Sequence, residues 1–121
     1  MIALDIDGVL LNVEPAIEKH LLRIFGPAGR RLRNGRHAIQ TEGGISKDGV
    51  HVAIGCALRD IDEIKPVYGA GALLGVISLL TEAPVQCVTA RRPDVAAYTD
   101  RALKRWFGVP FNVAHTGGAR K

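Results

Sequence analysis

Two carboxylates near the start of the chain have the clearest capacity for chemistry. Asp5 and Asp7 stand two positions apart in an apolar run that begins at Ile2, and Gly8 follows them. A short apolar run is typical of a buried strand. Carboxylates buried within a strand are costly unless they are paired or bind a metal ion. If the strand stops near Asp5, both acids stand at its carboxyl end, where open parallel sheets bind ligands.

This pair predicts a magnesium site with Asp5 and Asp7 as ligands, because Mg²⁺ prefers oxygen donors and keeps positions free for substrate phosphate. One carboxylate beside a metal can attack phosphorus as a covalent nucleophile, and its neighbour can transfer a proton. The alternative is a strand end with two solvated acids before a turn. We favour the functional interpretation because the whole run reads apolar-Asp-apolar-Asp-Gly-Val-Leu.

This stretch resembles the first motif of a known enzyme superfamily. The haloacid dehalogenase-like (HAD) hydrolase superfamily consists mostly of Mg²⁺-dependent phosphatases with an aspartyl-phosphate intermediate, and its first motif is similar to Leu4-Asp5-Ile6-Asp7-Gly8-Val9-Leu10. The resemblance implies that Asp5 is the nucleophile and that Asp7 is the general acid and base.

A second block resembles the same superfamily. Val85-Gln86-Cys87-Val88-Thr89 is similar to its second motif, and Thr89-Ala90-Arg91-Arg92-Pro93 looks like a sequence of its nucleotidase-like branch with one arginine inserted. The Thr89 hydroxyl and the following backbone N–H groups can bind a phosphoryl oxygen, or Thr89 simply caps the turn before the next helix. Arg91 or Arg92 can hold phosphate bidentately, and either can equally be a surface residue. The expected substrate-binding set is Gly8, Thr89, Ala90 and Arg91.

The two remaining motifs of the superfamily fall near or beyond the end of this sequence. The third is a basic residue that Lys121 would supply, with Arg120 as a second candidate, although a terminal lysine is more often solvated. The fourth is an acidic pair, and no Asp or Glu follows Asp100. Three explanations stay open: a fragment of a longer protein, acids from another chain, or substitution by Asp60, Asp62 and Glu63.

The pattern of apolar residues predicts an α/β fold. A first helix is expected to enter at Asn12–Pro15 and to stop at Gly26, and a shorter one is expected over residues 57–64. An apolar helix is expected around residues 70–80, ended by Glu82-Ala83-Pro84, and another from about Asp94, closed by Gly108. The 70–80 helix is apolar enough to be buried on most of its surface. Strands are expected over residues 2–5, 85–88 and 109–113, and strand or hairpin pieces over residues 38–40 and 50–54. Right-handed crossovers then give a three-layer, Rossmann-like (HAD-like) parallel sheet flanked by helices, whose C-terminal part is short or missing.

The length of 121 residues fits one domain. We expect a core of residues 1–14 and 66–121, with residues 15–65 inserted as a small cap. The third strand leaves an exposed sheet edge that invites pairing with a second copy.

Composition and charge limit the partners. No apolar run is long enough to span a membrane, acids stand where a signal peptide carries basic residues, and Cys56 and Cys87 read as free buried thiols. We therefore expect a cytoplasmic protein with no membrane partner. The net charge of +4 is uneven, with a basic cluster from Arg30 to His37. This cluster favours anionic partners, yet no aromatic residues interleave for base stacking, so a solvated loop is the more common outcome.

These observations favour a Mg²⁺-dependent phosphohydrolase acting on a small phosphomonoester, with a nucleotide as the first guess. Asp5, Asp7, Thr89 and Lys121 would carry the catalysis. A non-catalytic phosphate-binding or regulatory domain of the same fold is the alternative from another class. Processing of nucleic-acid ends through the Arg30–Arg36 cluster is a third hypothesis. We do not favour it, and we expect no nucleic-acid partner.

Overall fold

A computed structural model describes residues 2–33, 38–82, 85–108 and 111–116 of the chain. Its fold is α/β, with four α-helices, one parallel sheet and one small antiparallel pair. No helix in these residues is long and apolar enough to cross a membrane.

Three parallel strands form the main sheet. They are β1 (Ile2–Asp5), β4 (Val85–Thr89) and β5 (Asn112–His115), in the order β1-β4-β5. Asp5 lies in register with Val88, and Thr89 lies in register with His115. The carboxyl ends of the strands therefore meet at one edge, and the predicted parallel sheet is confirmed. As expected, β5 lies at an edge of this sheet.

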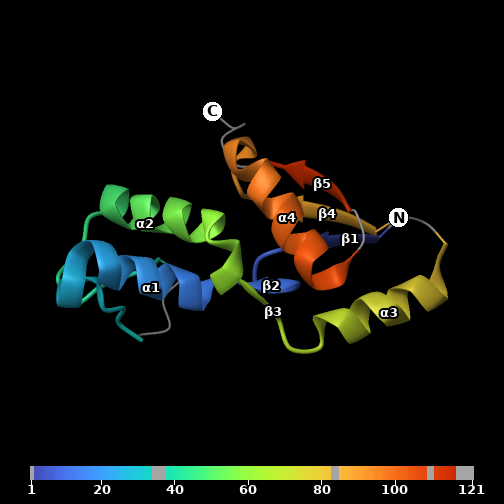
Figure 1. Ribbon diagram of the computed structural model, residues 1–121, viewed down its shortest axis with the longest axis horizontal. Helices are drawn as coiled ribbons and strands as arrows, with labels where there is room; N and C mark the ends of the chain where they lie inside the picture. Colours follow the sequence, from blue (N-terminus) through green and yellow to red (C-terminus); the bar gives the residue numbers. More distant parts are fainter. Residues whose placement is uncertain (1, 34–37, 83–84, 109–110, 117–121) are drawn as a thin grey trace.

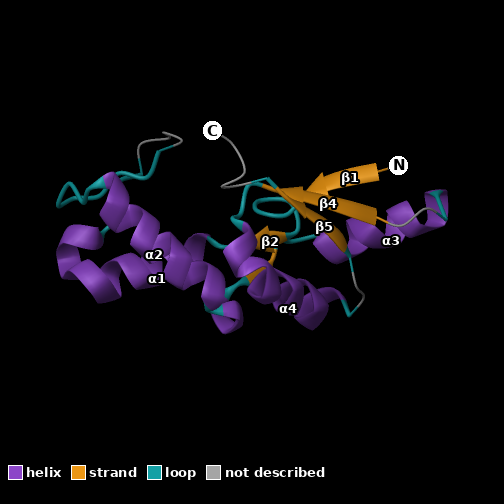
Figure 2. Cartoon of the chain, turned by 90° about the horizontal axis from the view of Figure 1, so that it is seen from above, coloured by secondary structure: helices purple, strands orange, loops and turns teal. Residues whose placement is uncertain are grey.

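Both crossover helices of the sheet lie on the same face. They are α3 (Ala70–Leu80), which precedes β4, and α4 (Ala96–Phe107), which precedes β5 (Figures 1 and 2). On the opposite face Ala3, Asp5 and Val88 are exposed. The predicted three-layer arrangement is therefore not formed by the described residues. Two right-handed crossovers that step the same way along a sheet place their helices on one side of it.

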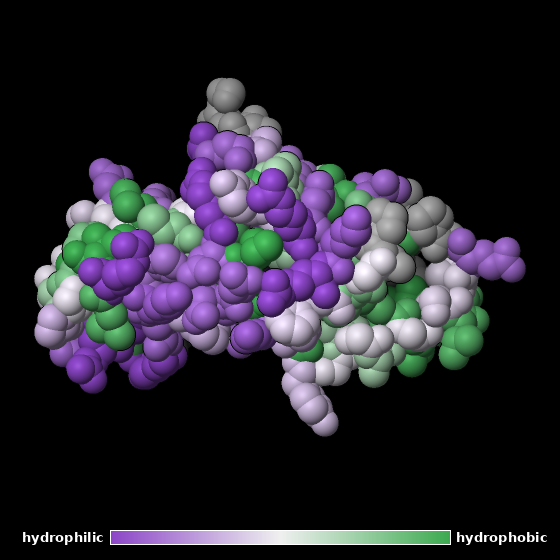
Figure 3. Space-filling model, in the orientation of Figure 1, coloured by the Kyte–Doolittle hydropathy of each residue, from purple (hydrophilic) through white to green (hydrophobic). Residues whose placement is uncertain are grey.

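The prediction that the 70–80 helix is buried on most of its surface is wrong. Ala70 and Ile77 are buried, whereas Leu79 is 87% exposed and Leu80 is 77% exposed. These apolar side chains lie at the end of the molecule formed by α3 (Figure 3). Hydrophobicity around the whole helix suggested burial on both sides, but the helix meets the sheet with one narrow stripe.

The helix α4 covers the sheet with a well-defined apolar stripe, as predicted. Val95, Ala102 and Leu103 are buried, and Phe107 packs against the core. Trp106 donates its indole N–H to the carbonyl of Ile64 at 2.7 Å, which ties α4 to the chain returning from the cap. A short 3₁₀ turn, η3 (Pro93–Val95), leads into α4.

Two helices form a separate pair beside the sheet (Figure 1). They are α1 (Glu14–Phe25) and α2 (Lys47–Arg59), with the 3₁₀ turns η1 (Gly26–Gly29) and η2 (Ile61–Glu63) following them. The short antiparallel strands β2 (Leu11–Asn12) and β3 (Lys65–Pro66) connect this pair to the sheet. The pair falls within residues 15–65 except for Glu14, and the cap boundaries themselves stay a prediction.

Two expectations in this region are wrong. Residues 50–54 are helical rather than extended, and the helix expected over 57–64 is the end of α2 followed by η2. The glycines at 43, 44 and 49 suggested a run of turns, but Ser46 caps α2 by accepting a hydrogen bond from the Gly49 N–H at 3.1 Å. The hairpin piece expected near residue 40 is a bridge between Arg31 and Thr41.

An ionic contact joins α1 to the end of α2. His20 Nε2 lies 2.8 Å from Asp60 Oδ2, and Lys19 Nζ lies 3.3 Å from the same oxygen. Desolvation opposes the charge of Asp60, but the hydrogen bonds and charges of His20 and Lys19 outweigh it, so that the pKa of Asp60 is lowered. The folded state therefore favours the ionised carboxylate.

This contact predicts a pH dependence of stability. A carboxyl group whose pKa is lower in the folded than in the unfolded chain stabilises the protein at pH values above its unfolded pKa of about 3.9. This contribution is lost as the pH falls through the pKa of the folded state. Asp60→Asn should therefore be less stable than the parent at neutral pH, with a deficit that shrinks below about pH 4. Urea unfolding across pH measures this, with the exposed Asp62→Asn as control. A deficit that does not change with pH would contradict it.

Burial in α4 and exposure in α3 predict very different effects of the same substitution. Leu103 is 2% exposed and Leu79 is 87% exposed. Leu103→Ala should lower the free energy of unfolding by about 2–5 kcal/mol because it leaves a cavity, and Leu79→Ala should change it by about 0.5 kcal/mol or less. Urea unfolding of both variants tests the packing. Equal losses would mean that α3 is buried.

Candidate functional site

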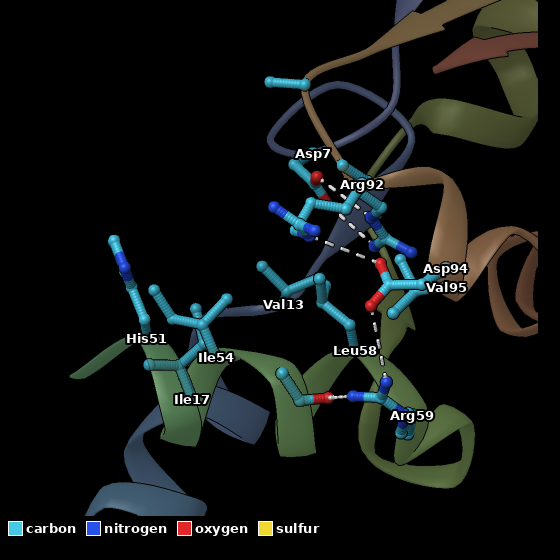
Figure 4. A pocket seen from close by; sticks show the side chains of 13 residues that line it. Asp7, Val13, Ile17, His51, Ile54, Leu58, Arg59, Arg92, Asp94 and Val95 are labelled. Carbon is cyan, nitrogen blue, oxygen red and sulfur yellow. Dashed lines mark hydrogen bonds and ion pairs between the residues drawn. The ribbon is translucent and has the colours of Figure 1, made fainter. Parts of the chain in front are cut away.

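A cavity of about 660 Å³ lies between the carboxyl edge of the sheet and the helix pair (Figure 4). The core contributes Asp7, which follows β1, and Ala90, Arg91 and Arg92, which follow β4. The helix pair contributes residues of α1 and α2 to the other wall. The cavity thus lies at the carboxyl edge of the parallel sheet, where open parallel sheets commonly bind ligands.

The strongest polar contact at this edge is an ion pair between Arg91 and Asp7. Arg91 donates from Nε to Oδ2 at 3.1 Å and from Nη2 to Oδ1 at 2.7 Å, so both carboxylate oxygens are engaged. The Arg91 side chain is 2% exposed and the Asp7 side chain is 35% exposed. Paired bidentate bonds of this kind fix orientation as well as charge. Arg91 is therefore not a surface residue.

Two threonines hold Arg91 in place. Its Nη1 donates to Thr99 Oγ1 at 3.0 Å, and its backbone N–H donates to Thr89 Oγ1 at 3.1 Å. Thr99 in turn donates to the carbonyl of Val95. Thr89 is 1% exposed and shows the turn-capping geometry. Its predicted phosphate contact stays a prediction.

Asp5 stands near the cavity without lining it. Its Oδ1 accepts the N–H of Ile6 at 2.8 Å, and the residue is exposed. Burial together with the nearby charge of Asp5 raises the pKa of the Cys87 thiol to about 11. The carboxylate of Asp5 therefore acts electrostatically on the neighbouring strand β4. Among the described residues, the hydrogen bond from the Ile6 N–H is the one that the Asp5 carboxylate makes.

The other predicted substrate contacts differ in their surroundings. Ala90 is exposed and lines the cavity, whereas Gly8 uses its N–H in the turn, donating to the Leu11 carbonyl at 2.9 Å. Gly8 has a φ of +85°, a conformation that side chains rarely adopt, so this turn requires glycine. Lys121 and Arg120 lie outside the described residues.

The donor set meets the lower limit of what Mg²⁺ requires. Mg²⁺ is commonly held by one or two carboxylates together with waters and substrate phosphate. Asp5 offers a free carboxylate oxygen, and Asp7 offers its backbone carbonyl while its carboxylate is paired with Arg91. No group of three or more His, Cys, Asp or Glu side chains suited to a metal ion occurs in the part of the chain that the structure describes. A magnesium site therefore stays a prediction, with Asp5 and the backbone carbonyl of Asp7 as the oxygens that would hold the ion together with a bound phosphate.

An ionic bridge that the sequence did not indicate links the two sides of the cavity. Asp94 in η3 lies 3.6 Å from Nε of Arg92 and 3.8 Å from Nη2 of Arg59, which belongs to α2 (Figure 4). All three side chains are about half exposed or more. The sequence placed Asp94 at a helix start and Arg59 in a cap of unknown structure, so no spacing could pair them.

The described part of the basic cluster pairs with acids rather than forming a free patch. Arg31 pairs with Glu14 and Arg33 pairs with Glu18, both on α1, and Arg30 lies 3.5 Å from Glu42. Burial lowers the pKa of Arg31, and the charge of Arg33 adds to this effect. Arg36 and His37 lie outside the described residues. These pairs reduce the charge available to a nucleic acid.

No family model, curated protein or solved structure matches this chain. The functional argument therefore rests on the residues and their geometry.

The unequal burial of Arg91 and Asp7 predicts unequal costs of removing either one. Asp7→Ala leaves a cation in the interior without a counter-charge, which should cost about 3 kcal/mol or more. Arg91→Met leaves a carboxylate that water reaches, which should cost about 1 kcal/mol. Urea unfolding of both single variants and the double variant measures the asymmetry, with the exposed Arg92→Met as a matched control. A larger loss of stability in Arg91→Met than in Asp7→Ala would contradict the burial of Arg91 and the greater exposure of Asp7.

Proposed function

We propose that this chain is a Mg²⁺-dependent phosphohydrolase that cleaves a small phosphomonoester through an aspartyl-phosphate intermediate. The observation that carries the proposal is the cavity at the carboxyl edge of the sheet, lined by Asp7, Ala90 and Arg91 beside the end of β1. The resemblance of both motif blocks to HAD-like hydrolases adds to it. The parallel sheet and helix pair would then be a HAD-like core and cap.

In this proposal Asp5 attacks the phosphorus in line with the leaving oxygen. The phosphoryl group would lie at the side of the cavity nearest β1, which ends at the exposed Asp5. The P–O bond to the leaving group breaks as the Asp5–phosphorus bond forms, and water later releases phosphate from Asp5. Backbone N–H groups after β4 and the basic side chain of Lys121 would bind the phosphoryl oxygens.

Asp7, once it has taken up a proton from solvent, gives that proton to the leaving oxygen and later accepts one from the attacking water. Arg91 donates one hydrogen bond to each oxygen of Asp7, and each oxygen keeps a second lone pair that can take the proton. Arg91 is thus a positioning residue that fixes the direction in which Asp7 faces. Thr99 and Thr89 hold Arg91 still during this exchange.

Asp5 and the backbone carbonyl of Asp7 would hold Mg²⁺. When bound, the ion supplies positive charge that offsets the charge of the phosphoryl oxygens and of Asp5. Without it, the exposed carboxylate of Asp5 repels a phosphate dianion.

Phosphate release from a panel of phosphomonoesters, with and without Mg²⁺, tests the proposal. The parent should show Mg²⁺-dependent turnover, and Asp5→Asn should retain less than about a tenth of it, because the amide cannot form the intermediate. Asp100→Asn, which changes an exposed acid on α4, is the matched control and should keep full activity. Turnover in Asp5→Asn close to that of the parent would exclude Asp5 as nucleophile.

A non-catalytic phosphate-binding domain is the second candidate. The observation that favours it is the engagement of both Asp7 oxygens by Arg91, together with the position of Asp5 outside the cavity lining. Such a domain would bind a phosphate ester and release no phosphate with any added metal ion. Calorimetric binding without turnover would favour this candidate over the hydrolase.

A further inference from the structure

The two walls of the cavity differ in chemistry. The core wall carries Asp7, Arg91, Arg92 and Asp94 (Figure 4). The opposite wall, formed by the helix pair, is aliphatic except for the exposed His51 and Arg59 of α2. A ligand that spans the cavity therefore meets charge at one end and hydrocarbon at the other.

The aliphatic wall is made of branched side chains from both helices. Ile54 and Leu58 belong to α2 and are half-buried, and Ile17 of α1 is 4% exposed. Val13, which directly precedes α1, is 8% exposed, and Val95 of η3 adds an apolar side chain, 3% exposed, from the core side. Ile54 and Leu58 are one helical turn apart, so they present one continuous surface. A non-polar group placed there removes apolar area on both sides from water, which favours binding.

The same wall offers little to a polar ligand. Among the described residues that line the cavity, none is aromatic and none is Ser, Thr, Asn or Gln. A sugar or a nucleobase placed against Ile54 and Leu58 would leave hydroxyl or amide groups without partners, which is costly in a partly closed site. His51, exposed at the rim, is the one hydrogen-bonding side chain in this set besides the arginines and aspartates. The wall therefore selects against the nucleotide that the sequence first suggested.

The charged end of the cavity, where Arg59 meets Asp94 and Arg92, carries a positive charge that is not neutralised and can pair with an anion. Arg59 and Arg92 share the single carboxylate of Asp94, at 3.8 Å and 3.6 Å. Arg91 and Asp7 neutralise each other. The charged side chains that line the cavity thus comprise three arginines and two aspartates, one net positive charge. An anionic group at this end is electrostatically matched.

We propose that the cavity binds a phosphate monoester whose leaving group is apolar, an arene or a branched alkyl group, with that group packed on Ile54 and Leu58. The phosphoryl end of this ligand rests on the proposed function, whereas the apolar end rests on the cavity wall. The volume of about 660 Å³ accommodates a group the size of a benzyl ring together with a phosphoryl group.

Two non-hydrolysable dianions separate the apolar from the polar class. Benzylphosphonate and 2-hydroxyethylphosphonate carry the same charged group, and isothermal titration calorimetry with Mg²⁺ measures both. Benzylphosphonate should bind at least about tenfold more tightly, as expected for burying part of a phenyl ring. Equal affinities, or no binding of either probe, would overturn the proposal. Tighter binding of the 5′-methylenephosphonate analogue of adenosine monophosphate would overturn it in favour of a nucleobase.

Substitutions in α2 test whether the preference for benzylphosphonate arises from contact with this helix. Ile54→Asn should remove the advantage of benzylphosphonate and leave the affinity for 2-hydroxyethylphosphonate unchanged. Val52→Asn is the matched control, because Val52 is on the same helix, is 57% exposed and does not line the cavity. If Ile54→Asn does not fold by circular dichroism, Ile54→Ala serves, with a smaller loss in the same direction. An unchanged preference in the folded variant would place the apolar group elsewhere and overturn the proposal.

Turnover separates this inference from the proposed function. Phosphate release from phenyl phosphate and glycerol 3-phosphate is measured in parallel with and without Mg²⁺. A preference for the benzyl probe without any phosphate release would reject the hydrolase and retain the apolar cavity. Equal kcat/KM values for the two esters, together with equal binding of the two phosphonates, would retain the hydrolase and reject the apolar leaving group.

Discussion

The ion pair between Arg91 and Asp7 is the contact on which the arrangement of the cavity depends. It joins two turns whose residues are 84 positions apart, one after β1 and one after β4. A guanidinium buried to this degree needs its charge compensated, and the bidentate bonds to Asp7 do so while Thr99 takes a further donor. The same contact orients the acid that the proposed reaction uses and limits how readily that acid can exchange a proton. The carboxylate of Asp7 thus both compensates the charge of the buried Arg91 and serves as the proposed general acid and base.

The direction of the crossovers explains why the rest of the sheet is one-sided. Since α3 and α4 both lie on one face, Asp5 ends β1 on a face that the described residues leave exposed. This exposure gives Asp5 a free oxygen and keeps it off the cavity lining. A phosphate reaching Asp5 would therefore sit at the boundary between the charged wall and solvent, where a metal ion keeps its waters.

The helix pair supplies a second, independent constraint on the ligand. Its position is held by the short β2–β3 connection, by the His20–Asp60 contact within the pair, and by the bridge from Arg59 to Asp94. That last bridge is solvent-exposed, so it is worth little energetically, and its place at the cavity makes it easy to open for an entering anion. In the proposed complex, the aliphatic residues behind it would contact the apolar part of the ligand.

The sequence by itself determined the parallel strands, the helix α4 and the grouping of Asp7, Ala90 and Arg91 at one edge. Strand ends and amphipathic stripes are local signals, and a parallel register then brings those ends together whatever the loops do. The tertiary structure alone decided that Arg91 pairs with Asp7, that α3 leaves Leu79 exposed, and that α2 forms the aliphatic wall. These features depend on which surfaces meet across long separations in the chain, and residue spacing carries no record of that.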